Sequence, residues 1–144
     1  LVIRRLRADG EEGANLSQRL FDQVTGHFDE ALRAVGVGDM SVGKRVKTMT
    51  SALYGRLSTY DGGLDADGHA VLREGLRRNL YGTAPDISES VLDAMTAYVI
   101  ATNARLAEVR FEAIQAGTDL FPDAGADWQL AESSETGHGE VSKS

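Results

Sequence analysis

The stretch that most resembles a chemical site is GVGDMSVGKRVK, residues 36–47. Gly38, Gly43 and Lys44 have the G-x-x-x-x-G-K spacing of a phosphate-binding loop, in which backbone amides and the lysine hold nucleotide phosphates. The next residue of such a loop is Ser or Thr, which holds magnesium, but here it is Arg45. A buried strand should also precede the loop, whereas residues 28–36, FDEALRAVG, have the pattern of an amphipathic helix. We therefore expect no nucleotide binding.

The glycines of this stretch have a structural use instead. Gly36 supplies a left-handed residue that ends one helix, and Gly38 permits the tight turn after it. Asp39 or Ser41 then caps the next helix with a side-chain oxygen.

The sequence offers few residues for a metal site or for a catalytic site of another kind. The chain has no cysteine, which excludes thiolate metal ligands and cysteine nucleophiles, and its three histidines, His27, His69 and His138, lie far apart in sequence. Asp39 and His69 could each be posed as catalytic, but a capping carboxylate and a solvated histidine at a helix start explain them more simply. We expect no metal, no cofactor and no enzymatic activity.

The elements that position these residues are helical. Apolar residues recur at steps of three and four, which is the spacing of one face of a helix. They predict a first helix over about 14–35 and a second helix from Val42 to about Tyr60, which ends at Gly62 and Gly63. A third helix is predicted over about 67–81, and one long last helix over about 87–116 stops at Gly117. No alternating strand pattern is present. The fold class is therefore all-α, a compact multi-helix domain with a long C-terminal helix.

Two regions of the chain differ in charge. The net charge is -7, yet residues 121–144 alone carry five carboxylates and one lysine. We expect residues 1–121 to form the domain and 122–144 an acidic, disordered tail, with Trp128 folding back onto the helices. Lys44, Arg45, Lys47 and Arg56 form a local basic region that would attract an acidic surface or phosphate headgroups.

A face of small side chains follows the basic region. Thr48, Ser51, Ala52, Gly55 and Thr59 lie opposite the apolar stripe of their helix, and a glycine inside a helix costs about 1 kcal/mol relative to alanine. Small side chains let another backbone come close. Two interpretations remain open: packing against a helix of the same domain, or a groove that admits a partner's helix.

The same residues resemble a known family. FDEALRAVGVGDMSVGKRVKTMTSALYGRLSTYDGGL is similar to the central region of the ubiquinol-cytochrome c chaperone family, relatives of an assembly factor for respiratory complex III. The resemblance begins at LVIRRLR, includes Asp22, Leu32 and the block 36–44, and continues to Arg78 and Asn79, covering most of the first 82 residues. Family members have further helical sequence before this point, so we expect part of the domain to precede Leu1.

The resemblance implies a non-enzymatic chaperone that binds newly made cytochrome b and promotes assembly of complex III, or ubiquinol-cytochrome c reductase, in the respiratory chain. It implies a cytoplasmic protein peripheral at the inner membrane, or one on the matrix side in mitochondria, with a small helper protein or the ribosome as further partners. We predict that protein binding involves Asp39, Lys44, Arg45, Lys47, Ser51, Tyr54, Gly55, Arg56, Tyr60 and Asn79.

Two other functions fit the residues. One is a helical adaptor that binds a soluble partner helix through the small-residue face. The other is a helical bundle that encloses a lipid, quinone or haem, for which His27 is the candidate ligand, although a histidine satisfied within the core explains that residue more simply.

Overall fold

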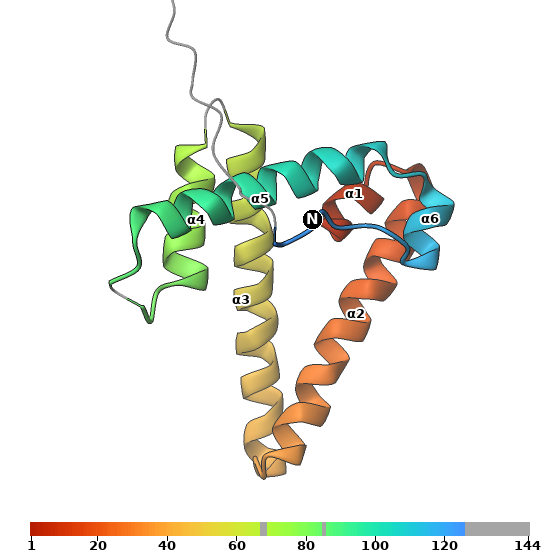
Figure 1. The fold of residues 1–144 in the computed structure, drawn as a ribbon. Coiled ribbons are helices and arrows are strands. Elements are labelled where there is room, and N and C mark those ends of the chain that lie inside the picture. Colours follow the sequence, from red (N-terminus) through yellow and green to blue (C-terminus); the bar gives the residue numbers. More distant parts are fainter. Residues whose placement is uncertain (67–68, 85, 126–144) are drawn as a thin grey trace, which may run out of the picture.

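Six helices make up the part of the chain that the structure describes. The computed structural model describes residues 1–66, 69–84 and 86–125 (Figure 1), and over these residues it contains no strand, which confirms the all-α prediction. The helices are α1 (Val2–Leu6), α2 (Gly10–Ala34), α3 (Asp39–Asp65), α4 (Ala70–Leu80), α5 (Glu89–Glu108) and α6 (Phe111–Ala116). Residues 126–144, with Trp128 and most of the expected acidic tail, lie outside the described residues.

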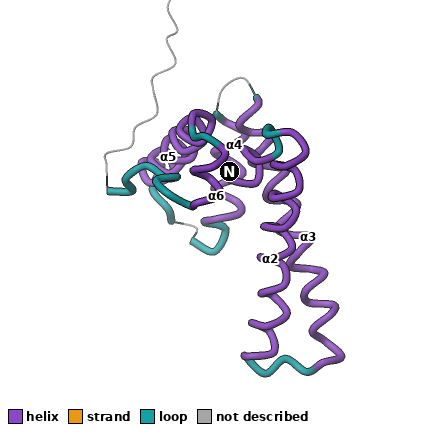
Figure 2. Tube along the Cα trace, turned by 90° about the vertical axis from the view of Figure 1, so that its right-hand side faces the viewer, coloured by secondary structure: helices purple, strands orange, loops and turns teal. Residues whose placement is uncertain are grey.

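The two longest helices, α2 and α3, form an antiparallel hairpin. Gly36 has a φ of +82°, which favours glycine, and it ends α2 as predicted. Figures 1 and 2 show the hairpin extending well beyond the other helices, with the connecting loop at its far end. Midway along it, the buried ring of Phe21 packs against Tyr54, with ring centroids 4.5 Å apart. The hairpin is therefore an arm joined to the rest of the molecule at one end.

The core of that remaining part lies where α3, α4 and α5 meet. Leu72 and Leu76 of α4 are buried against Leu92 of α5. Burying one such side chain stabilises the fold by about 1.5 to 3 kcal/mol. Half-buried side chains from the three helices and the residue after α4 surround this cluster: Tyr60, Leu64, Tyr81, Met95, Val99 and Ile100.

Helix α1 joins the hairpin to α5. Arg4 donates to the carboxylate of Asp65 in α3, and its two guanidinium nitrogens lie 2.5 and 3.1 Å from the two carboxylate oxygens. Arg5 donates to the carbonyl oxygens of Leu106 and Val109 at 2.8 and 2.9 Å. Helix α1 is thus held by polar contacts to the end of α3 and to the end of α5.

Two predicted boundaries are wrong. The expected single last helix is divided, because Val109 and Arg110 adopt extended backbone between α5 and α6, and Arg5 takes up two carbonyls at this break. Helix α3 also continues through Gly62 and Gly63 to Asp65. Gly63 is buried against α4, so packing between the helices outweighs the low helix propensity of glycine. Gly117, with a φ of +68°, ends α6 as predicted.

Candidate functional site on the helical hairpin

Nine of the ten predicted partner-binding residues lie on one helix, α3. They are Asp39, Lys44, Arg45, Lys47, Ser51, Tyr54, Gly55, Arg56 and Tyr60, while Asn79 is half-buried on α4. Lys44, Ser51 and Gly55 follow one another at steps of seven and four, so they share a face of α3, and all three are exposed. Arg45 and Arg56 share a neighbouring face. The ten residues therefore do not form a single surface.

Two of the predicted tyrosines differ in their surroundings. Tyr60 is half-buried and packs against the core cluster of α4 and α5, which gives it a role in packing. Tyr54 is 50% exposed while its ring packs on Phe21. Of the two, only Tyr54 presents a large part of its ring to a partner.

The G-x-x-x-x-G-K segment forms the start of a helix. Helix α3 begins at Asp39, and the amides of Ser41 and Val42 donate to the carbonyl of Gly38 at 2.8 and 3.3 Å. These amides are engaged inside the helix and do not line a loop that could wrap phosphates. The capping prediction is wrong in detail, since Gly38 is the N-cap residue and no side chain caps it. The Asp39 carboxylate instead pairs with Arg33 at the end of α2.

Lys44, Arg45 and Lys47 of the predicted basic region are exposed. Lys44, Arg45 and Lys47 make no ion pair with any residue in the described part of the chain. Because α3 begins at Asp39, they lie in its second and third turns, beyond the first turn in which the helix dipole acts most strongly. Lys44 and Arg45 border a shallow hollow of about 480 Å³, which the side chains of Leu32 and Met49 also line.

Of the two interpretations of the small-residue face, packing against a helix of the same domain does not apply at Gly55 within the described residues. A Cβ added to Gly55 would have no heavy atom within 4 Å apart from its own helix, so the surface of α3 is open at this position. Close approach occurs instead between α3 and α4. A Cβ added to Gly63 would lie 2.7 Å from the backbone of Leu72. A Cβ added to Gly75 would lie 2.7 Å from the methyl carbon of Thr59. Packing within the domain therefore does not account for Gly55.

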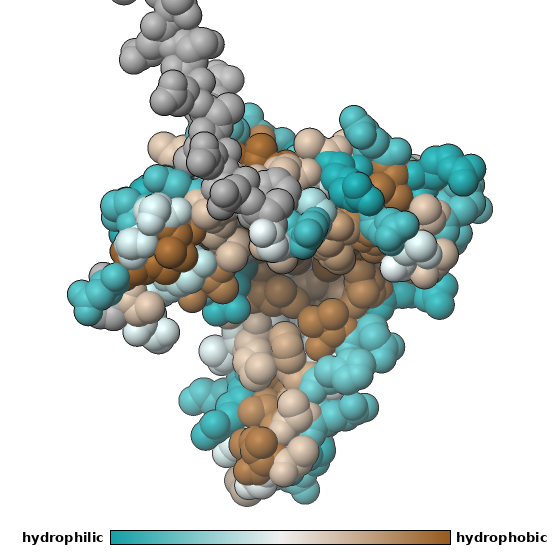
Figure 3. All heavy atoms as spheres, viewed as in Figure 1, coloured by the Kyte–Doolittle hydropathy of each residue, from teal (hydrophilic) through white to brown (hydrophobic). Residues whose placement is uncertain are grey.

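Apolar side chains are exposed along the hairpin. Figure 3 shows hydrophobic surface over both of its helices and in the hollowed region beneath α5. The large apolar residues of the hairpin that are more than a third exposed are Val24, Val35, Met40, Met49 and Tyr54. Such a concentration of exposed apolar surface is a mark of an interaction site.

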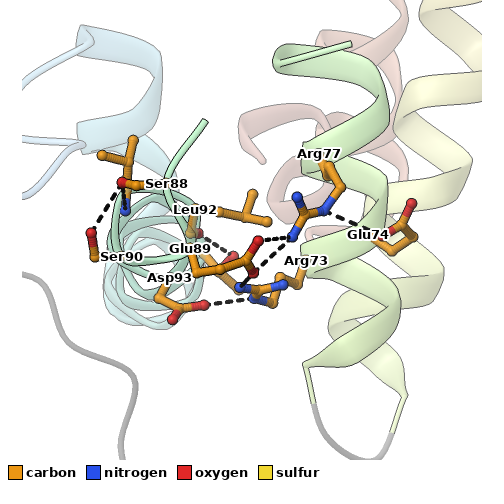
Figure 4. Close-up of polar contacts among 10 residues, drawn as sticks. Arg73, Glu74, Arg77, Ser88, Glu89, Ser90, Leu92 and Asp93 are labelled. Atoms are coloured by element: carbon orange, nitrogen blue, oxygen red, sulfur yellow. Dashed lines mark hydrogen bonds and ion pairs between the residues drawn. The ribbon is translucent and has the colours of Figure 1, made fainter. Parts of the chain in front are cut away.

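A charged cluster between α4 and α5 was not predicted from the sequence (Figure 4). Arg77 donates to both carboxylate oxygens of Glu89 at 2.7 and 2.8 Å, and Arg73 donates to Glu89 and, at 2.6 Å, to Asp93. Hydrogen bonds from Arg77 and Arg73 lower the pKa of Glu89 from 4.5 to about 2. The four residues are 4 to 20 positions apart on two helices, so no local pattern could have paired them. Both arginines are paired with carboxylates of α5, so the cluster links α4 to α5 through ion pairs.

The two histidines within the described residues, His27 and His69, belong to no metal-binding group. His138 lies outside the described residues. His27 is exposed, and its Nδ1 lies 2.7 Å from the carbonyl oxygen of Gln23 in the same helix. It is therefore neither a buried core histidine nor positioned inside a haem pocket. Across the described residues, no group of three or more His, Asp or Glu side chains is arranged to hold a metal ion.

Comparison with known proteins identifies one family. The model of the family described as ubiquinol-cytochrome C chaperone matches residues 1–121. No curated protein and no solved structure matches the chain. None of the helices within the described residues has a stretch long and apolar enough to cross a bilayer.

Proposed function

The chain belongs to the ubiquinol-cytochrome C chaperone family, and we propose that it is a non-enzymatic assembly chaperone that binds newly made cytochrome b. In this role it promotes the assembly of respiratory complex III, ubiquinol-cytochrome c reductase. Residues 1–121 form the chaperone domain, and the acidic segment 122–144 lies outside it.

The exposed apolar surface of the α2–α3 hairpin is the observation that supports this proposal. A membrane protein that has not yet joined its partner subunits presents apolar helices, and an apolar groove can receive a helix along its length. Met49 and Tyr54, on the third and fifth turns of α3, are 37% and 50% exposed, and Val24 of α2 is 37% exposed. These side chains lie on an arm that reaches away from the core, where a client can contact both helices.

The charged side chains near the tip of the hairpin suit binding to a partner. The charged clusters of the domain consist of arginines that are satisfied by carboxylates or backbone carbonyls, as in Arg5 with Leu106 and Arg77 with Glu89. The basic residues Lys44, Arg45 and Lys47 point instead to an acidic or anionic partner. We place the chain at the inner face of the membrane that receives the client, with a small helper protein or the ribosome as further partners.

One observation favours a second candidate function. The face formed by Lys44, Ser51 and Gly55 is exposed, and an added Cβ at Gly55 meets no neighbour. A soluble partner helix could pack closely there, which is the behaviour of a helical adaptor.

Co-purification distinguishes the two functions. The full chain is used as bait on detergent extracts of membranes from cells that assemble complex III, and the captured proteins are identified. Recovery of cytochrome b without its sister subunits is the expected result, because capture precedes assembly. Recovery of soluble proteins alone, with normal complex III in cells that lack the chain, contradicts the proposal and favours the adaptor.

A further inference from the structure

The loop between α2 and α3 forms the tip of the hairpin, at the end farthest from the core (Figure 2). Aliphatic side chains at this tip are exposed. Val35, which follows α2, is 77% exposed, and Met40 in the first turn of α3 is 101% exposed. Both side chains therefore lie largely or wholly outside the packing of α2 on α3. Full exposure of methionine and valine to water is unfavourable, so a surface that covers them would stabilise the bound state.

Cations accompany these apolar side chains. Met40, Lys44 and Lys47 follow at steps of four and three, so they lie along one exposed face of α3. Arg45 lies beside them at the rim of the hollow that Leu32 and Met49 line. Aliphatic groups at the end of the arm are thus followed within two turns by three positive charges.

The nearby carboxylates do not neutralise these cations. Asp39 and Asp29 both pair with Arg33, and the Nε of Arg33 lies 2.6 Å from Asp29. Glu30 borders a different hollow of α2, together with Arg19 and His27. Over residues 31–49 the chain carries four cations and one carboxylate. Among the described residues, the tip therefore has an uncompensated positive charge, although the net charge of the whole chain is -7.

We propose that the hairpin tip docks on an anionic bilayer surface. Lys44, Arg45 and Lys47 would contact the phosphate headgroups, and Val35 and Met40 would enter the boundary between headgroups and acyl chains. An RNA surface would also attract the cations, but it would favour aromatic side chains that stack on bases, and residues 35–49 contain none. The aliphatic tip fits a lipid surface, and this docking does not depend on the identity of the client.

Vesicle flotation tests the proposal with the purified full chain. Vesicles of phosphatidylcholine are compared with vesicles that also contain phosphatidylglycerol. We expect flotation only with the anionic vesicles, and less flotation as salt rises. Replacing Lys44, Arg45 and Lys47 together by Gln should weaken binding by about a hundredfold, since each cation near an anionic surface strengthens binding about fivefold. Met40→Asp should also weaken it.

Two control variants test whether the loss of binding is specific to the hairpin tip. Arg19, Arg78 and Arg110 are exposed, and their replacement by Gln changes the net charge equally. Val71→Asp alters an apolar residue of 54% exposure away from the tip. Both controls should float like the unmodified chain. Equal loss in the charge control, equal binding to neutral vesicles, or RNA binding without flotation would overturn the proposal. Flotation without recovery of cytochrome b would leave it standing and contradict only the proposed function.

Discussion

The backbone of Gly63 in α3 lies directly against the backbone of Leu72 in α4, where a Cβ added to the glycine would be 2.7 Å from both the nitrogen and the Cα of Leu72. Backbone atoms cannot move aside as a flexible side chain can. Gly63→Ala should therefore separate the two helices and lower the free energy of unfolding by about 1 to 3 kcal/mol. Urea denaturation followed by circular dichroism measures this.

Gly55→Ala is the matched control on the same helix. An added methyl group there meets no neighbour, so the substitution should raise the free energy of unfolding by up to about 1 kcal/mol through the better helix propensity of alanine. The free energy of unfolding should therefore change in opposite directions in Gly63→Ala and Gly55→Ala. A change in the same direction would contradict the claim that the close contact at Gly63 sets the distance between α3 and α4.

Acid should weaken the ion-pair cluster that links α4 to α5 through Arg73, Arg77 and Glu89. The pKa of Glu89 is lowered in the folded protein from 4.5 to about 2, so its interaction with Arg73 and Arg77 is fully present above pH 4.5 and is lost as the pH falls towards 2. Glu89→Gln should lower the melting temperature at neutral pH.

The difference between the unmodified chain and this variant should shrink as the pH falls from about 4.5 to about 2. Glu74→Gln serves as control, because Glu74 lies 3.7 Å from Arg77 within α4 and does not bridge two helices. A difference between Glu89→Gln and the unmodified chain that stays constant over this range would contradict the lowered pKa.

The basic residues of the tip should be dispensable for folding. Lys44, Arg45 and Lys47 have no ion pair with the described residues, so their combined replacement by Gln should change the free energy of unfolding by no more than about 0.5 kcal/mol. Thermal unfolding of the variant checks this. A clear loss of stability with unchanged vesicle binding and complex III assembly would mean that the cations serve contacts within the protein.

The segment that resembles a phosphate-binding loop should not bind nucleotide. Its Ser41 and Val42 amides already donate within α3, and a phosphate could reach them only if the first turn of the helix unfolded. Calorimetry with magnesium ATP and magnesium GTP should show no saturable heat. Saturable binding that Lys44→Ala abolishes would contradict this.

The periodic part of the fold could be predicted from the sequence. Steps of three and four between apolar residues found the long helices, and the left-handed preference of glycine at Gly36 and Gly117 found two of their ends. Both are local properties of the chain.

Long-range contacts decided the features that were not predicted. The break after α5 depends on Arg5, which lies 101 residues before Leu106, and α3 continues through Gly63 because α4 packs there. For the site, the exposure of the cations followed from their pattern, but Tyr60 packs in the core because α4 and α5 cover its side of α3.

Site-specific photocrosslinking from Tyr54 tests most directly whether the hairpin holds newly made cytochrome b. Tyr54 and Phe121 are replaced in turn by a photoreactive phenylalanine, because both are aromatic and similarly exposed, at 50% and 54%, and only Tyr54 lies on the hairpin. After a pulse of labelled synthesis in cells, crosslinks to cytochrome b should form from position 54, decline as complex III assembles, and be at least several-fold weaker from position 121. Equal crosslinking from both positions, or none to cytochrome b from position 54 while complex III assembles normally, would contradict the account.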